Sequence, residues 1–416
     1  MKINPDTFCS AAWFGIRNRQ DMTKTVCCQL DWNTQDPGTE QMSPLDYLNS
    51  QKIVNMRKQM HEGKKVPQCQ QCWTIESQGR RSLRLNLNDF ISNGRGSSLQ
   101  SSWLQSYFNR KDDFKTDQVM LTDIKIGNTC NFACVMCNPK DSSMIYNYWS
   151  KNKDNEFVQK HLQQDPKYFE NAKFTGFKQN AYRDYIQDVL ENNNKIKRIS
   201  LLGGEPTLDE KLFAMLYNIS EDRKKNISLN IITNGSNNIL ERTKKLGNYA
   251  KIHWTISLEG IQDVQDYARY GSKWNLVEAN ILEQAQHDPH SITVAPLVQA
   301  TTITGLPQLI NWANKNNIPL HVQDIYAPTY LGLDSVPTEL KQQVIRQLEK
   351  ISDFKVAVND ENIPWDMSAI INTINDSTFD QKKLVQFKNY LKFYEKDRQM
   401  KSFIEVCPEW RTYFEV

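Results

Sequence analysis

The chain has 416 residues, of which 39% are apolar and 24% charged, and its formal net charge is +3. This length allows two or three domains, and so small a charge, without a dense Lys/Arg block, gives no reason to expect nucleic-acid binding. No segment approaches the roughly 18 apolar residues of a membrane span, and MKINPDTFC lacks the charged-then-apolar pattern of a signal peptide, so we expect a cytoplasmic protein.

Five of the nine cysteines lie before residue 73. Cys69 and Cys72 form a CxxC, a spacing that lets two thiolates hold one metal ion or cluster. With Cys9 and one member of the adjacent pair Cys27 and Cys28 they make a four-cysteine set, because neighbouring side chains on extended backbone point to opposite faces. On spacing alone, such a set suits a structural zinc ion and an iron–sulfur cluster equally well.

The segment from Asn93 to Ser101 (NGRGSSLQS) is rich in Gly and Ser and predicts a linker. We therefore expect a small Cys-rich module over residues 1–92, a linker over 93–117 and a larger domain over 118–333. Within that domain, the polar stretch from Asn152 to Gln179 is most simply explained as decorated surface, and a substrate lid is the alternative.

Strand-like and helix-like segments alternate through the larger domain. The expected strands are Gln118–Ile126, Ile196–Leu202, Ile227–Ile232, Lys251–Leu258, Ser291–Gln299 and Leu320–Ile325. The expected helices are Tyr182–Glu191, Leu208–Ser220, Asn238–Leu246, Leu276–Gln286 and Leu306–Lys315. This alternation predicts an α/β fold with a parallel sheet and right-handed crossovers.

Three cysteines, Cys130, Cys134 and Cys137, follow the first expected strand with the spacing Cys-x3-Cys-x2-Cys. Soft thiolate ligands suit a 4Fe–4S cluster. Three ligands for four irons leave one iron open, just as three-ligand zinc sites keep one position for catalysis. The plainer alternatives are a zinc site or three unrelated cysteines of a core.

The next three strands each run into a distinctive motif. These motifs are Gly203-Gly204-Glu205-Pro206, Thr233-Asn234-Gly235 and Ser257-Leu258-Glu259-Gly260. In a parallel barrel the chemistry lies on the loops after the carboxyl ends of the strands, which makes these residues candidates for a binding site. Each also has a plainer explanation, as a tight βα turn or a helix cap.

The cysteine loop and the strand-end motifs, in this order, resemble those of the radical S-adenosylmethionine (radical SAM) enzymes. The resemblance implies a partial (β/α)6 TIM-like barrel in which the three cysteines hold a 4Fe–4S cluster and its open iron binds SAM. An electron passed through the cluster then cleaves SAM to a 5′-deoxyadenosyl radical. The SAM-binding positions implied in this chain are Gly203, Gly204, Glu205, Pro206, Asn234, Ser257, Glu259 and Arg269. Many members have Asp where this chain has Glu259.

The N-terminal segments Phe8–Trp13, Val26–Leu30, Asn55–Trp73 and Glu76–Arg84 resemble the auxiliary-cluster module called Twitch, an abbreviated relative of the SPASM domain. This resemblance implies a second 4Fe–4S cluster held by Cys9, Cys28, Cys69 and Cys72, and Cys28 is preferred to Cys27 on the resemblance alone. Such a cluster would be an electron relay or a structural staple, or would bind substrate through an open iron. A structural zinc ion remains the alternative.

From Asp334 onward, apolar residues recur at three-to-four spacing and predict a helical extension over 334–416. The tail from Ser402 to Trp410 resembles the closing segment of the same Twitch-containing group. Cys407 is most simply a small buried hydrophobic residue, although a spare thiol can also donate a hydrogen atom to a substrate radical.

The resemblance implies an enzyme that abstracts hydrogen from a substrate carbon and takes its electron from a reductant such as flavodoxin or ferredoxin. An oxygen-sensitive cluster also needs a reducing compartment. We expect a peptide or protein substrate by analogy with the family, and oxidation or epimerisation of a sugar or other small molecule is the alternative. A third possibility is a non-catalytic zinc-binding interaction protein.

Overall fold

The computed structural model describes the chain except for residues 1, 20, 31–37, 93–100, 112, 167–168, 171–175, 352–353, 359–360, 366 and 416, and except for the side chains of 176–180, 354–358 and 361–365. Most of the Gly/Ser-rich linker and part of the polar stretch 152–179 therefore lie outside the described residues. Within the described ranges, no helix is both long and apolar enough to cross a bilayer.

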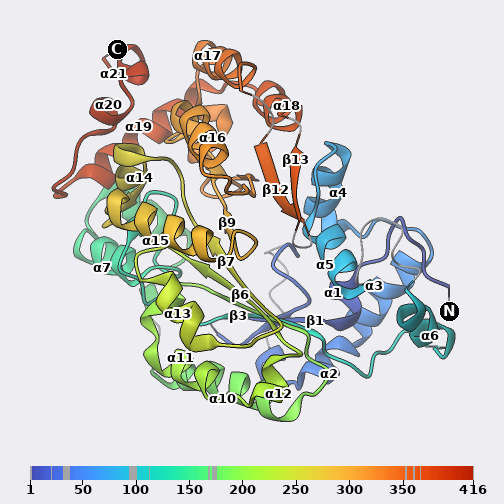
Figure 1. Ribbon diagram of the computed structural model, residues 1–416. Coiled ribbons are helices and arrows are strands. Elements are labelled where there is room, and N and C mark those ends of the chain that lie inside the picture. The colour runs from blue at the N-terminus through green and yellow to red at the C-terminus, as the bar shows by residue number, and fades with distance from the viewer. Residues whose placement is uncertain are drawn as a thin grey trace.

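A seven-stranded sheet in the order β2-β1-β3-β5-β6-β7-β9 forms the centre of the molecule (Figure 1). Its strands are β1 (Gly15–Asn18), β2 (Lys24–Thr25), β3 (Leu121–Lys125), β5 (Arg198–Leu202), β6 (Ser228–Thr233), β7 (Lys251–Ile256) and β9 (Ile292–Val294). Only β1 and β2 are antiparallel, and every other neighbouring pair is parallel. The predicted α/β fold with a parallel sheet is confirmed, and it is consistent with a partial barrel.

The two edges of the sheet differ from the six-strand expectation. The expected strand Ser291–Gln299 is divided at Pro296 into β9 and β10 (Leu297–Val298), because proline has no N–H to donate to a ladder. The last expected strand meets the sheet only by a bridge from Leu320 to Val294, and its β11 (Gln323–Asp324) pairs with β10 in a separate ladder. At the opposite edge, β1 extends the sheet.

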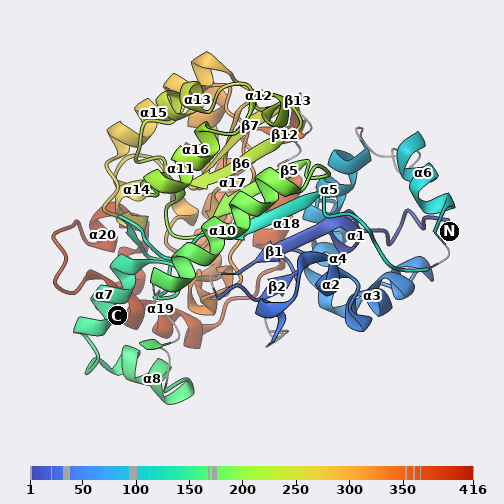
Figure 2. The same ribbon diagram turned by 90° about the horizontal axis from the view of Figure 1, so that it is seen from below.

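Helices follow the strands in alternation and cover one face of the sheet (Figures 1 and 2). Those of the barrel are α7 (Ser143–Lys151), α8 (Glu156–Gln164), α10 (Gly176–Asn192), α11 (Glu210–Tyr217), α12 (Glu221–Lys224), α13 (Ile239–Leu246), α14 (Gln262–Ala268), α15 (Trp274–His287) and α16 (Leu306–Lys315). Strand residues on this face, such as Ile199, Ile231 and Trp254, are fully buried in the main core.

The N-terminal region has a second core of its own, in which aromatic side chains such as Trp13, Phe14 and Phe108 pack with aliphatic ones. Its helices are α1 (Ser10–Phe14), α2 (Pro44–Leu48), α3 (Gln51–His61), α4 (Gln70–Ser77), α5 (Leu83–Ser92) and α6 (Ser102–Asn109). Two features differ from the expected arrangement, in which a separate module over residues 1–92 is joined to the larger domain by a linker over 93–117. Strand β1 belongs to the central sheet, and α6, in the range 93–117, buries Leu104 and Phe108 in this second core.

The C-terminal region is mostly helical, with α17 (Thr338–Leu348), α18 (Ser368–Asp376), α19 (Gln381–Glu395), α20 (Phe403–Val406) and α21 (Arg411–Phe414). One hairpin, β12 (Phe354–Val358) with β13 (Glu361–Trp365), interrupts the helices, and its first strand is rich in the β-branched and aromatic residues that strands favour. The buried side chains of α19 and Cys407 belong to the main core. Cys407 is thus placed as a small buried residue, with its Sγ 3.7 Å from the Thr301 carbonyl oxygen.

Candidate functional site

The cysteine loop leaves the carboxyl end of β3 and is tied to the rest of the domain at its start and in its middle. At its start, the Ile126 N–H donates to the Leu202 carbonyl oxygen (2.9 Å) at the end of β5. In its middle, Ala133 and Cys134 form β4, which is antiparallel to β8 (Arg269–Tyr270). The loop therefore lies at the carboxyl edge of the parallel sheet, where the sequence predicts the site.

Cys130, Cys134 and Cys137 lie on this loop near enough to act electrostatically on one another. Burial, followed by the neighbouring Cys134, raises the pKa of the Cys130 thiol to about 12. Burial also raises the pKa values of Cys134 and Cys137, and the other two loop cysteines raise that of Cys137 further. A bound metal cluster would replace these protons, because metals bind the thiolate. The donor set, three soft thiols on one loop, fits an iron–sulfur cluster.

With the cysteine loop counted as the first strand-end motif, the motifs that begin at Gly203, Thr233 and Ser257 are the second, third and fourth. The glycine pair of the second motif packs directly against the cysteine loop. Gly203 and Gly204 have φ values of +84° and +47°, and a Cβ on Gly204 would overlap the Thr129 carbonyl oxygen. The Glu205 N–H donates to that same oxygen (2.7 Å). The glycines are therefore required for close contact between two segments of this chain's own backbone. The resemblance had implied only that they allow close contact with SAM.

Glu205 joins the second motif to the third. Its buried carboxylate accepts hydrogen bonds from the Thr207 N–H (3.0 Å) and hydroxyl (2.6 Å). It also accepts from the Thr233 hydroxyl (2.7 Å) and the Asn234 N–H (2.7 Å). Burial raises the pKa of Glu205, and these four hydrogen bonds oppose that rise. Glu205 thus holds the two loops together, and both of its carboxylate oxygens already accept hydrogen bonds from the protein.

Asn131, inside the cysteine triplet, was not singled out in the sequence. Its Oδ1 accepts a hydrogen bond from the Asn234 side chain (2.8 Å), and its Nδ2 donates to the Ser236 hydroxyl (3.0 Å). These bonds join the cysteine loop to the third motif. The only indication in the sequence was its position between two candidate ligand cysteines. The cysteine spacing does not predict what an asparagine at that position would bind.

Glu259 and Arg269 form an ion pair beside Cys134. The Arg269 guanidinium donates to the Glu259 carboxylate (2.5 Å) and to the Cys134 Sγ (3.5 Å). The Glu259 side chain is fully buried and also accepts from the Leu297 N–H (2.9 Å). The Arg269 side chain is therefore largely buried, at 12% exposure, and contacts both the cysteine loop and Glu259. The half-buried Ser257 donates its N–H to the Thr233 carbonyl oxygen (2.9 Å) nearby.

Buried polar atoms without a partner surround this ion pair. Among the described residues they include Arg269 Nε, Gln265 Nε2 and Gln299 Oε1. Such atoms are costly unless a ligand or water completes their hydrogen bonds. The surroundings of Glu259 and Arg269 therefore fit a polar ligand next to the cysteine loop.

Replacing Arg269 by Met should lower the free energy of unfolding of the apoprotein by about 3 kcal/mol, because the buried Glu259 carboxylate loses its cation. Chemical denaturation measures this change. Lys401→Met is the matched control, since its ion pair with Asp263 is exposed (60% and 59%), and it should leave stability unchanged within error. Equal effects of both substitutions would contradict a structural role for the Glu259–Arg269 pair.

Helix α19 and the segment after it brace the cysteine loop from a distant part of the sequence. The Tyr390 hydroxyl donates to the Val135 carbonyl oxygen (2.5 Å), and the Tyr394 hydroxyl donates to that of Ala133 (3.2 Å). Arg398 donates to the same Ala133 oxygen (3.1 Å). Its guanidinium also lies over three aromatic rings, those of Tyr148 (4.5 Å), Tyr270 (4.8 Å) and Tyr394 (4.0 Å).

The substitution Arg398→Met should destabilise the protein by about 2 kcal/mol, the combined loss of a hydrogen bond and of cation–π contacts. It should also speed the loss of iron from the reconstituted protein to a chelator, because the loop that carries Cys134 loses a support. Arg398→Lys keeps the charge but not the planar group, and we expect an intermediate effect. Unchanged iron retention in both variants would show that the contacts of Arg398 do not stabilise the cysteine loop.

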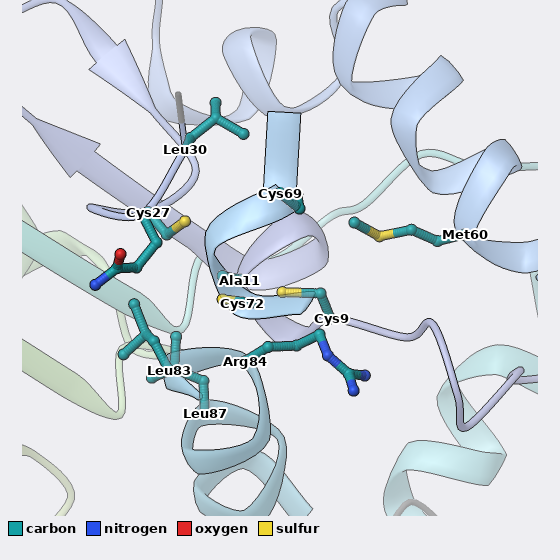
Figure 3. A pocket seen from close by; sticks show the side chains of 11 residues that line it. Cys9, Ala11, Cys27, Leu30, Met60, Cys69, Cys72, Leu83, Arg84 and Leu87 are labelled. Carbon is teal, nitrogen blue, oxygen red and sulfur yellow. The ribbon is translucent and has the colours of Figure 1, made fainter. Parts of the chain in front are cut away.

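Four of the five N-terminal cysteines, Cys9, Cys27, Cys69 and Cys72, line a hollow of about 360 Å³, a volume that includes space open to solvent (Figure 3). Cys9 precedes α1, Cys27 follows β2, and Cys69 and Cys72 lie at the start of α4. Burial raises the pKa of Cys9 to about 11 and that of Cys27 to about 12. It also raises those of Cys69 and Cys72. Four thiols around one space fit a group with soft metal atoms.

The structure places Cys27 in the hollow, whereas the sequence resemblance favoured Cys28. Cys27 is a lining residue, and electrostatic repulsion from Cys9 and Cys72 raises its pKa. A turn begins at Cys28, and Cys28 is not among the residues that line the hollow. In the part of the chain that the structure describes, no three His, Cys, Asp or Glu side chains lie close enough to hold one metal ion as they stand.

Comparison with solved structures finds similarity at low sequence identity. TYW1 with a bound lysine-pyruvate adduct is 13% identical over 55% of this chain and 72% of its own, with a TM-score of 0.30. SuiB of Streptococcus suis, bound to the precursor peptide SuiA, is 13% identical over 72% and 60% (TM-score 0.36). The enzyme anSMEcpe with AdoMet and the Cp18Cys peptide is 14% identical over 70% and 98% (TM-score 0.34). Scores this low carry no functional inference.

Among curated proteins none matches the sequence. The model of the radical SAM superfamily matches residues 124–287, from β3 through the cysteine loop to α15. That range contains every candidate residue at the carboxyl edge of the sheet. Residues 124–287 therefore match a radical SAM domain, and this match supports an enzyme.

Proposed function

We propose that Cys130, Cys134 and Cys137 hold a 4Fe–4S cluster and that SAM binds beside it, between the second and fourth strand-end motifs. When bound, these groups supply reductive cleavage of SAM and abstraction of a hydrogen atom from an unreactive substrate carbon. The observation that carries the proposal is the Arg269 guanidinium, which contacts both the Cys134 Sγ and the Glu259 carboxylate. One side chain thereby links the cluster loop to the fourth motif.

The protein's own part is to position the reactants and to supply fixed charge. Glu205, Thr129 and Asn234 hold the loops in register, while the orphaned Arg269 Nε is available to a carboxylate such as that of SAM. Gly203, Gly204 and Pro206 shape the backbone next to the cysteine loop. Ser257 lies at the end of the following strand, where a ribose hydroxyl is a suitable partner for its hydroxyl group.

For the N-terminal hollow we propose a second 4Fe–4S cluster held by Cys9, Cys27, Cys69 and Cys72. Four thiols leave no iron open, so this cluster would relay electrons or stabilise the module. A structural zinc ion on the same four residues is the alternative. A reductant such as flavodoxin or ferredoxin, in a reducing compartment such as the cytoplasm, supplies the electron.

The proposed substrate is a peptide or protein, and a sugar or other small molecule is the alternative class. This choice follows the wider group of enzymes with auxiliary clusters, several of which act on ribosomal peptides. It is an analogy at the level of the family.

The experiment that tests the proposal measures iron, sulfide and zinc in anaerobically reconstituted protein and assays dithionite-driven SAM cleavage on the same sample. About eight irons per chain with 5′-deoxyadenosine formed supports both clusters. About four irons with one zinc and 5′-deoxyadenosine keeps the reaction but replaces the second cluster. Zinc without SAM cleavage contradicts the proposed reaction and leaves a zinc-binding protein.

A further inference from the structure

Helix α19 lies between the cysteine loop and an exposed surface of the protein. On its buried face, the Tyr390 and Tyr394 hydroxyls bond the carbonyl oxygens of Val135 and Ala133, the two neighbours of Cys134 in the sequence. The same two rings are near enough to the loop for Cys137 to act electrostatically on Tyr390, and Cys134 on Tyr394. The inner face of α19 is thus in direct contact with the segment that carries the proposed cluster ligands.

The opposite face of α19 is exposed and basic. Its exposed residues recur at three- and four-residue spacing, which places them on one side of the helix. They are Lys382, Val385, Asn389, Lys392 and Lys396, the last directly after the helix. The one acid within α19 is Glu395, which is half-buried. It accepts hydrogen bonds from the Tyr267 hydroxyl (2.9 Å) and the Phe403 N–H (2.7 Å), so its carboxylate is engaged on the inner side.

The charges of this face are not balanced by the carboxylates beside it. From 380 to 398 the chain has six basic and three acidic residues. Among the described residues Lys382 and Lys392 form no ion pair, and Lys396 donates to the Asn152 side chain (3.3 Å). Of the acids, Asp380 accepts from the Lys382 N–H (2.8 Å) at the start of α19, and Asp397 is exposed. The face therefore carries a local excess of positive charge.

Helix α7 extends the surface without adding acids to it. The Tyr148 hydroxyl of α7 donates to the carbonyl oxygens of Phe393 (2.6 Å) and Lys396 (2.7 Å). The sequence of α7 contains an exposed lysine, Lys151, and no carboxylate. Beyond α7 the charges are even, with two acids and two lysines up to the middle of α8: Asp154, Glu156, Lys153 and Lys160.

The strand-end motifs contact the cysteine loop from other directions. Gly204 packs on Thr129, and Asn234 bonds Asn131 (2.8 Å). The proposed function assigns that part of the loop to SAM, so an electron from outside has to arrive elsewhere. Helix α19 offers such a route, because an α-helix with its side chains is only about 10 Å across. A protein seated on the lysine face is therefore separated from the loop by a single helix.

We propose that the exposed face of α19, around Lys382, Lys392 and Lys396, is the docking surface for the one-electron carrier that reduces the cluster, and that this carrier docks through an acidic surface. The inference rests on the proposed function, because it presupposes a reducible cluster on the loop. In the step itself the reduced carrier loses one electron and the cluster gains it, with no bond formed or broken. Complementary charge steers such encounters, and the exposed Val385 (47%) supplies an apolar contact among the lysines.

The rate of 5′-deoxyadenosine formation by the reconstituted enzyme tests this, with reduced flavodoxin, reduced ferredoxin and dithionite as alternative reductants. The double variant Lys392→Glu/Lys396→Glu should be about tenfold slower than the wild type with at least one protein carrier at low salt and limiting carrier concentration. With dithionite, which needs no docking surface, it should react at the wild-type rate. Added salt should slow the carrier-driven wild type and have little effect on the variant.

The matched control is Lys244→Glu/Lys245→Glu. It makes the same change of charge at two exposed lysines of α13, a helix that lies well apart from α19 in both views (Figures 1 and 2). This control should keep the wild-type rate with every reductant. Equal slowing of both double variants by the protein carriers would show an effect of net charge alone and would overturn the assignment of the surface.

A binding measurement separates docking from chemistry. Surface plasmon resonance with immobilised protein that lacks the cluster should show weaker binding of flavodoxin or ferredoxin to Lys392→Glu/Lys396→Glu than to the wild type and to the α13 control. Equal binding by all three, or a wild type that cleaves SAM with dithionite but with neither carrier, overturns the inference. A wild type that does not cleave SAM with dithionite contradicts the proposed function instead, and the binding comparison still decides whether α19 is a docking surface.

Discussion

The triple variant Cys130→Ala/Cys134→Ala/Cys137→Ala should form no 5′-deoxyadenosine from SAM and should remain folded. The three thiols are the soft donors of the loop, so without them the proposed cluster has no protein ligand. The fold should survive, because Cys134 is the most buried of the three, at 6% exposure, while Cys130 and Cys137 are half-buried, and shortening a buried cysteine to alanine costs about 1 kcal/mol. Chromatography of the reaction products with dithionite as reductant measures the loss, and circular dichroism measures the fold.

Cys407→Ala is the matched control for this variant. Cys407 is also buried (1% exposed), but its Sγ lies against the Thr301 carbonyl oxygen. The control should therefore keep full SAM cleavage. Cleavage that persists in the triple variant would contradict the central proposal, and loss of cleavage in the control would show that cysteine replacement acts through the core.

Local sequence was sufficient to predict the parts of the site that are built from neighbouring residues. The cysteine spacing and the motifs at Gly203, Asn234 and Glu259 each follow a buried strand, and the parallel alternation brings those strand ends to one edge. Hydrophobic periodicity located β3, β5, β6 and β7 for the same reason. These elements are defined by short-range patterns that a sequence displays directly.

Contacts between distant segments could not be predicted in the same way. Arg398 reaches the Ala133 carbonyl oxygen across 265 positions of the chain, and no periodic pattern around either residue indicates that meeting. Strand β1 is only four residues long, too short to show alternation, and its place beside β3 depends on the packing of the second core. The ion pair between Glu259 and Arg269 was likewise not expected, because the sequence resemblance implied only that each residue serves SAM.

The sequence could not decide between Cys27 and Cys28 either, because the answer depends on how distant segments pack around the hollow. Substitution of each cysteine in turn tests which one is the ligand. If the N-terminal hollow holds a 4Fe–4S cluster, Cys27→Ala should lower the iron content of the reconstituted protein by about four atoms per chain. Cys28→Ala should leave it unchanged, because Cys28 is not among the residues that line the hollow. The two substitutions remove the same atoms at adjacent positions, so general damage to the module would affect both variants similarly.

Metal analysis together with the absorbance of the iron–sulfur chromophore decides the outcome. Loss of about four irons in Cys27→Ala alone identifies Cys27 as the fourth ligand, and its physical reason is the side-chain direction that the turn after β2 imposes. Loss in Cys28→Ala alone would contradict the placement of Cys27 in the hollow. If the zinc content of Cys27→Ala falls and its iron content does not, the four cysteines remain the ligands but the site is structural, since zinc brings no redox chemistry to it.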